Sequence, residues 1–158
     1  MIRAITASET GLPLGALVDL LRAAHETHPD PRQLGLAPVH EYCAQGLADL
    51  LLGPVRDEQD WSIDVSRICR CRLCGALAEF LRASNQRQRE WPLAKNERSH
   101  VHGVIDAYAF PVTHVTRRQG RPFTLVLTKT DALFDREAAE RARWDRDVKW
   151  LTRTARAF

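Results

Sequence analysis

The stretch Cys69-Arg70-Cys71-Arg72-Leu73-Cys74 places three of the four cysteines of the chain within six residues. Thiolates two or three residues apart can converge on one Zn²⁺ ion while the backbone between them turns around the metal. A structural zinc site needs four donors. The stretch therefore predicts most of a zinc-finger-like site, whose fourth ligand must come from another part of the chain.

Three histidines downstream are candidates for the fourth ligand: His100, His102 and His114. The apolar spacing of Val101, Val104, Ile105 and Tyr108 predicts a helix over about 93–108, with His100 and His102 on either side of its apolar stripe. On an unbroken helix these two side chains point about 200° apart and cannot bind one ion. An extended backbone would instead place both on one face. Periodicity alone leaves the choice open.

Cys43 and the start of the chain give two further expectations, one about the core and one about the compartment. Cys43 lies in a predicted helix and is expected to be a small buried hydrophobe. The segment Met1–Thr6 lacks the long apolar stretch of a secretory signal, and no apolar run approaches the ~18 residues of a membrane span. We therefore expect a cytoplasmic protein, or a nuclear one in a eukaryote, with no membrane partner. In such a reducing compartment, clustered cysteines favour metal over disulfides.

Hydrophobic periodicity predicts an α+β fold that is mostly helical, with about five helices and one β-hairpin. The helices are expected over about 13–27, 38–52, from near Cys74 onwards, over 93–108 and from about Leu133 to the end. The two strands of the hairpin are expected at Val112–Thr116 and Phe123–Lys129, joined by a basic turn.

We expect residues 1–158 to form a single domain with three segments. Residues 1–60 would hold an N-terminal helical pair and an acidic linker, residues 61–130 the zinc-binding core with its hairpin, and residues 131–158 the C-terminal helix. The last helix carries an apolar stripe that either docks on the core or supports self-association. The stripe consists of Trp144, Val148, Leu151, Ala155 and Phe158.

Basic residues concentrate around the cysteines. Residues 67–130 hold 12 basic and 4 acidic side chains, whereas residues 1–66 hold 4 basic and 10 acidic ones. Such a concentration can attract a nucleic acid or an acidic protein. The chain also contains 20 Arg and only 3 Lys, a bias that is typical of GC-rich coding sequences. The candidate contact face comprises Arg70, Arg72, Arg87, Arg89, Arg117, Arg118 and Arg121.

Five motifs between about Trp61 and Trp150 occur together in this chain. They are Trp61-Ser62-Ile63, Cys69-x-Cys71-x₂-Cys74, Phe80-Leu81-Arg82, Arg98-Ser99-His100-Val101 and the segment Pro122–Thr130. The combination resembles a cysteine-rich module near the C-terminus of large fungal and bacterial proteins described as 2-oxoglutarate- and Fe(II)-dependent oxygenase-like. The resemblance implies that His100 joins Cys69, Cys71 and Cys74 as the zinc ligand, and it gives His102 no place.

The sequence does not predict oxygenase chemistry in this chain itself. A 2-oxoglutarate oxygenase needs a facial triad, usually His-x-Asp or His-x-Glu with a distant histidine. His28-Pro29-Asp30 is the one such sequence, and it lies between two predicted helices, where we interpret it as a turn with Asp30 as a cap. The chain also has too few strand-like segments for a jelly-roll barrel. It would be at most an accessory part of a dioxygenase.

The leading hypothesis is a non-catalytic zinc-binding module with a basic surface, which mediates protein or nucleic-acid contacts for an oxygenase-like protein. Four protein ligands would leave no position for an activated water. The alternative is a zinc-dependent hydrolase or deaminase, with water as the fourth ligand and His100, His102 or Glu97 as the base. The His-x-Glu sequence of zinc deaminases is, however, absent from the chain. The helical segments could also dock into a larger assembly.

Overall fold

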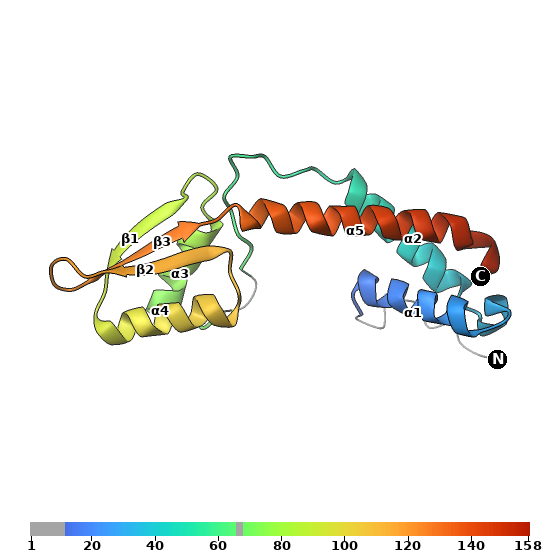
Figure 1. The fold of residues 1–158 in the computed structure, drawn as a ribbon, viewed down its shortest axis with the longest axis horizontal. Coiled ribbons are helices and arrows are strands. Elements are labelled where there is room, and N and C mark those ends of the chain that lie inside the picture. The colour runs from blue at the N-terminus through green and yellow to red at the C-terminus, as the bar shows by residue number, and fades with distance from the viewer. Residues whose placement is uncertain (1–11, 66–67) are drawn as a thin grey trace. The chain divides into compact units, whose positions relative to one another are not determined.

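The computed structural model describes residues 12–65 and 68–158, and it confirms a mostly helical α+β fold (Figure 1). The segment Met1–Thr6, considered above for a secretory signal, lies outside the described residues. None of the described helices combines the length and apolar character needed to cross a bilayer. In chain order the elements are α1 (Leu14–Thr27), η2 (Pro31–Leu34), α2 (Ala37–Leu52), α3 (Arg72–Arg82), β1 (Gln88–Pro92), α4 (Lys95–Ala107), β2 (Val112–Arg117), β3 (Thr124–Lys129), α5 (Ala132–Thr154) and η3 (Ala155–Ala157).

The helix predictions are confirmed to within a few residues. Pro38 lies in the first turn of α2, where its missing N–H removes no helical hydrogen bond. Helix α3 begins slightly earlier than the apolar pattern indicated. Cys71 is the N-cap residue of α3, and its sulfur accepts a hydrogen bond from the backbone N–H of Cys74. The cysteine stretch thus forms the N-terminal cap of the helix.

The sheet has three strands rather than the two of the predicted hairpin, in the order β1-β3-β2. Strand β1 pairs antiparallel with β3, with Gln88 opposite Thr128 and Trp91 opposite Leu125. Its own sequence is a weak strand signal because it is short, polar and ends in Pro92, a residue suited to an edge strand. Pairing with β3, rather than local propensity, therefore makes this segment a strand.

Helices α3 and α4 pack on one face of the sheet. The core between them contains Leu77, Phe80 and Leu81 of α3, Val101, Val104 and Ile105 of α4, and Leu125 and Leu127 of β3. In β2, burial alternates, so Val112, His114 and Thr116 face the helices. Val115 lies between them in sequence and is 64% exposed on the other face. The alternation matches the predicted strand period of two.

The chain divides into two compact units, one of them Arg56–Glu137 and the other combining the residues up to Val55 with Ala138–Phe158. The second of these contains α1, α2 and most of α5, and it has its own core of Leu17, Val18, Leu21, Cys43, Leu47 and Leu151. Helix α5 begins in the first unit and ends in the other. Each unit therefore buries its own apolar side chains.

The apolar stripe of the C-terminal helix packs within the chain, which was the first of the two predicted alternatives. Leu151 is fully buried, and Trp144, Val148 and Phe158 pack against the core that α1 and α2 form. Ala155 is exposed. Cys43 is fully buried in the same core, which confirms its predicted role, and burial raises the pKa of its thiol to about 11.

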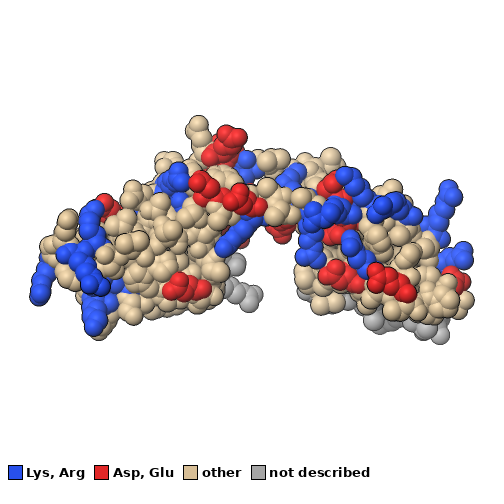
Figure 2. All heavy atoms as spheres, in the orientation of Figure 1, with Lys and Arg blue, Asp and Glu red and all other residues tan. Residues whose placement is uncertain are grey.

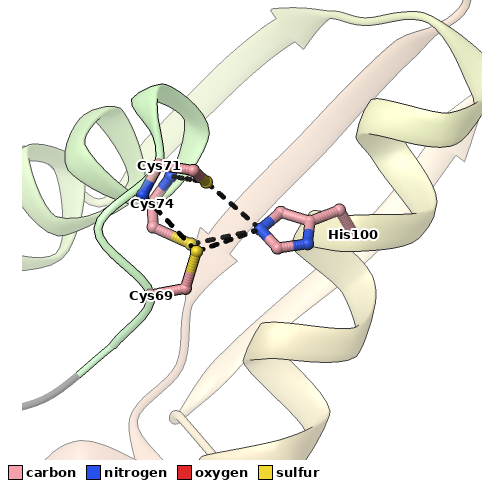
Figure 3. A group of neighbouring side chains, drawn as sticks. All are labelled: Cys69, Cys71, Cys74 and His100. Carbon is pink, nitrogen blue, oxygen red and sulfur yellow. Dashed lines mark hydrogen bonds between the residues drawn. The ribbon is translucent and has the colours of Figure 1, made fainter.

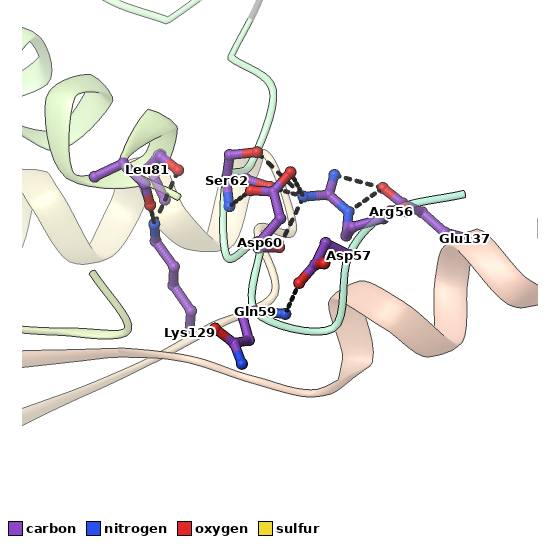
Figure 4. Close-up of polar contacts among 9 residues, drawn as sticks. Arg56, Asp57, Gln59, Asp60, Ser62, Leu81, Lys129 and Glu137 are labelled. Carbon is purple, nitrogen blue, oxygen red and sulfur yellow. Dashed lines mark hydrogen bonds and ion pairs between the residues drawn. The ribbon is translucent and has the colours of Figure 1, made fainter. Parts of the chain in front are cut away.

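The segment predicted as an acidic linker, Arg56–Asp60, has its contacts in the unit Arg56–Glu137 (Figure 4). The Arg56 guanidinium donates through Nε to the Glu137 carboxylate at 2.7 Å, and through Nη1 to the carbonyls of Asp60 and Ser62 at 3.0 and 2.6 Å. Beyond it, the Ile63 N–H donates to the Leu81 carbonyl at 2.7 Å. One arginine thus ties this segment to the first turns of α5.

Lys129, the last residue of β3, is fully buried beside the C-terminus of α3 (Figure 4). Its Nζ donates to the carbonyls of Leu81 and Ala83 at 3.0 and 2.7 Å, and lies 4.8 Å from the centre of the Phe80 ring. A cation at this position satisfies helix-terminal carbonyls that have no partner inside the helix. Burial lowers the pKa of Lys129 to about 8.

Lys129 makes the stability of the fold depend on pH. From pH 8 to about 10.5, its ordinary value, the unfolded chain keeps a proton on this side chain that the folded chain has released. The free energy of unfolding should therefore rise over this window, by at most about 3 kcal/mol. We expect denaturant titrations to show this rise in the wild-type protein and not in Lys129→Met.

Lys149→Met is the matched control, because it removes an exposed lysine that pairs with Asp145 four residues away. This variant should retain the wild-type pH dependence. The role assigned to Lys129 would be wrong if the two variants showed the same dependence on pH between 8 and 10.5.

Candidate metal centre

Three cysteine sulfurs and one histidine nitrogen converge at the N-terminus of α3 (Figure 3). The ligand atoms of Cys69, Cys71, Cys74 and His100 all lie within 4.8 Å of one another. The Nε2 atom of His100 is 3.9 Å from the sulfur of Cys69, 3.4 Å from that of Cys71 and 3.3 Å from that of Cys74. Among the described residues, no other group of three or more potential ligands comes together in this way.

The local backbone explains how the cysteines converge. The Cys71 N–H donates to the Cys69 sulfur at 3.4 Å, and the Cys74 N–H donates to the Cys71 sulfur at the same distance. These two bonds turn the chain around the sulfurs before α3 continues. His100 lies in the second turn of α4, and its imidazole points across to the start of α3 (Figure 3). The ligands thus join two helices that share a core.

The pKa values of the clustered thiols indicate how a bound cation would change their charge. The Cys71 thiol accepts a hydrogen bond from the Cys74 N–H and contacts Cys69, which lowers its pKa to about 6. Burial, together with the neighbouring Cys71 and Cys69 sulfurs, raises the pKa of the Cys74 thiol to about 12. Without a cation, the three sulfurs cannot all be charged at neutral pH. A divalent ion would stabilise all three thiolates and release protons as it binds.

The donor set fits zinc. Three thiolates and one imidazole form one of the usual ligand sets of a tetrahedral structural Zn²⁺ site. Zn–S bonds of ~2.3 Å and Zn–N bonds of ~2.0–2.1 Å imply sulfur–nitrogen separations of roughly 3.5 Å around a tetrahedron. The observed separations of 3.3–3.9 Å bracket that value. Soft thiolates also disfavour Mg²⁺ and Ca²⁺, which prefer oxygen ligands.

The structure separates the three histidines that the sequence left as candidates. His100 lies with the cysteines, whereas His102 and His114 lie against each other. Their Nδ1 atoms are in direct contact, and their ring centroids are 4.7 Å apart. Burial lowers the pKa of His102, and the nearby His114 lowers it further. As predicted for an unbroken helix, His100 and His102 leave α4 on different sides.

The other residues considered for catalysis are held in structural contacts. The Glu97 carboxylate accepts hydrogen bonds from the Ala94 N–H at 3.1 Å and from Arg72 at 2.8 Å. The predicted turn at His28-Pro29-Asp30 is confirmed, since it lies between α1 and η2. Asp30 precedes η2, but its carboxylate binds the side chains of Arg32 and Gln33 instead of capping the backbone.

Four of the seven arginines in the predicted contact face are engaged within the unit Arg56–Glu137. Arg72 pairs with Glu97, Arg87 with Asp131, and Arg117 with Glu90 across the sheet. Arg89 donates to the Ala76 carbonyl at 2.7 Å. The remaining three, Arg70, Arg118 and Arg121, are exposed and make no ion pair or hydrogen bond with the described residues.

Two features of the site region were not identified from the sequence. One is the contact between His102 and His114, which depends on α4 lying along β2, whereas the sequence indicates each of these residues only as a separate candidate ligand. Lys129 takes the third inward position after Leu125 and Leu127 in an alternating strand, a pattern that could have indicated a buried lysine.

The ligand set can be tested by cobalt substitution. In the Co²⁺-loaded protein, each thiolate bound to the metal contributes to a near-ultraviolet charge-transfer band. We expect Cys69→Ser, Cys71→Ser and Cys74→Ser each to weaken this band by roughly one third or to abolish binding, since each removes one of three sulfurs. Cys43→Ala is the control and should leave the band unchanged. An equal loss in Cys43→Ala would contradict the ligand set.

Comparison with known proteins identifies no relative of this chain. No protein-family model, no curated protein and no solved structure matches this chain. The link to oxygenase-like proteins therefore stays a prediction from the resemblance of the motifs, and the conclusions about function rest on the geometry of the site.

Proposed function

We propose that this chain is a non-catalytic zinc-binding module in which Zn²⁺ fastens the N-terminus of α3 to α4. The observation that carries the proposal is the convergence of four ligand atoms within 4.8 Å, three from the cysteine stretch and one from α4. The zinc would act as a structural clamp in the unit Arg56–Glu137.

A closed coordination sphere supports a structural role. Three cysteines and a histidine fill the four positions of tetrahedral zinc, so no position remains for a water or a substrate. The groups that could act as a base in the alternative hydrolase or deaminase hypothesis are also engaged elsewhere. His102 contacts His114, and Glu97 binds Arg72 and the Ala94 N–H.

The energetic case for a clamp rests on the size of α3. The helix has only 11 residues, and helices of that length are marginal without tertiary contacts. Zinc bound by four protein ligands can supply on the order of 10 kcal/mol to local order. The exposed Arg72–Glu97 pair spans the same two helices but, being mostly solvated, adds little. The metal would therefore provide most of the attachment at this end.

His100→Ala tests the clamp directly. The purified full-length protein should contain about one zinc per chain by elemental analysis, and His100→Ala should lose most of it. We also expect the variant, or the wild-type protein treated with a chelator, to unfold at a temperature lower by 10 °C or more, since a loss of several kcal/mol shifts a domain of this size by roughly that amount.

His25→Ala serves as the control for histidine removal, because His25 is exposed on α1 in the other unit. It should keep its zinc, and its unfolding temperature should fall far less than that of His100→Ala, because the ring contacts of His25 with Trp150 and Phe158 lie outside the zinc-binding unit. Full zinc content and unchanged stability in His100→Ala would refute the four-ligand clamp.

For the partner, we infer that the free arginines at the tip of the β2–β3 hairpin contact the phosphates of a nucleic acid. Figure 2 shows Lys and Arg side chains gathered at the end of the unit where this loop lies. Arg118 and Arg121 flank Gln119 and Gly120, and the φ of 75° at Gly120 permits the turn. Both arginines are exposed and unpaired among the described residues, so their guanidinium groups are free for phosphate oxygens.

Replacing both arginines tests this contact. Fluorescence anisotropy with labelled oligonucleotides should show binding that weakens steeply with salt, and Arg118→Ala/Arg121→Ala should reduce the slope of log K against log salt by about two. The control is Arg32→Ala/Arg143→Ala, which removes the same charge from two arginines that pair with Asp30 and Asp19. Equal effects of both double variants, or binding only to acidic proteins, would refute a nucleic-acid contact at the hairpin.

A further inference from the structure

The paired histidines on α4 and β2 form a second cluster of potential metal ligands. His102 lies on the side of α4 that faces the sheet, and His114 lies on the face of β2 that the helices cover. Their Nδ1 atoms are in direct contact. Imidazole nitrogens are the preferred ligands of several divalent transition metals, and this pair is separate from the cysteine stretch.

The outer nitrogen of each ring has an oxygen partner. The Nε2 atom of His114 lies 3.0 Å from a carboxylate oxygen of Asp106, and the Nε2 atom of His102 lies 3.4 Å from the hydroxyl of Thr116. An ionised carboxylate accepts hydrogen bonds and cannot donate them. In a neutral His114, the nitrogen that faces Asp106, Nε2, therefore carries the proton. The Nδ1 lone pair of His114 then points at His102. This is the tautomer that a metal bound at Nδ1 requires.

His102 can adopt the same tautomer because a hydroxyl both donates and accepts. In the metal-free pair, Nδ1–H of His102 donates to His114 and Nε2 accepts from the Thr116 hydroxyl. If the proton moves to Nε2, the ring donates to the Thr116 oxygen instead, and both Nδ1 lone pairs face one point. No proton need leave the pair. Metal-binding histidines commonly have such partners at the outer nitrogen, and carboxylates are frequent among them.

From this arrangement, we propose that His102 and His114 form a second metal site, which takes a divalent transition metal of the kind that imidazole favours, such as Ni²⁺ or Zn²⁺. Two protein ligands leave the remaining coordination positions to water or to an external ligand. The site is accessible, since the His114 side chain is 21% exposed. The two rings must move slightly apart to admit the ion, because two bonds of ~2.0–2.1 Å at a tetrahedral angle place the two nitrogens roughly 3.3 Å from each other, further than in their present direct contact.

Nickel binding to the zinc-loaded, tag-free full chain tests this site. Equilibrium dialysis followed by elemental analysis reports zinc and nickel per chain in the same sample. We expect about one nickel per chain in addition to the original zinc. His114→Gln should lose this nickel and keep the zinc, because the glutamine amide can still donate to Asp106 and preserve the packing. His25→Ala should bind nickel as the wild-type protein does.

Asp106, the hydrogen-bond partner of His114, allows a second test in which both proposed metal ligands are kept. Asp106 is 69% exposed, so Asp106→Ala should fold normally. Loss of a carboxylate behind a metal-bound histidine weakens affinity by about 10–100-fold, and we expect a decrease in that range for nickel. The proposal would be overturned if His114→Gln bound as much nickel as the wild-type protein, or if the nickel taken up matched the zinc released. The zinc content of each sample reports on the cysteine site separately.

Discussion

In the function that we propose, the convergence of three sulfurs on one imidazole nitrogen is the interaction on which the unit Arg56–Glu137 depends most. Helix α3 is short, and it must hold a fixed place for its apolar face to form the core with α4 and β3. Its N-terminus is positioned by the cysteine cluster and its C-terminus by Lys129, which binds the carbonyls of Leu81 and Ala83. Both ends of the helix thus have partners for groups that a helix cannot satisfy by itself.

Helix α4 presents histidines on two of its sides with different chemistry. His100 reaches three sulfurs, whereas His102 reaches His114 on β2. Residues two apart on a helix differ in direction by about 200°, so the two side chains cannot serve one site. Helix α4 therefore contributes to two groups of potential metal ligands. One consists of His100 and the three cysteines, and the other consists of His102 and His114. In the functions proposed here, the first holds the fold together and the second remains open to solvent ligands.

Several arginines in this chain act as hydrogen-bond donors to its own backbone. Arg56, Arg82, Arg89, Arg136 and Arg141 each donate to at least one main-chain carbonyl. The guanidinium group suits this role because it offers several donors in a fixed plane. Much of the positive charge that the sequence shows between residues 67 and 130 is therefore used inside the unit. A smaller set, Arg70 beside the cysteines and Arg118 and Arg121 at the tip of the β2–β3 hairpin, makes no ion pair or hydrogen bond within the described part of the chain.

The sequence by itself determined the helices, the hairpin and the three cysteines of the candidate metal centre. Each of these follows from a local signal, such as apolar spacing, the turn at Arg117–Pro122 or cysteines separated by one and two residues. Local reasoning still left His100, His102 and His114 open, and the resemblance to a cysteine-rich module favoured His100. Tertiary structure decided what depends on distant segments. It made Gln88–Pro92 a strand by pairing it with β3, and it brought His102 to His114 by laying α4 along β2. Those contacts join residues that are far apart in the chain, and their geometry is set by packing rather than by spacing.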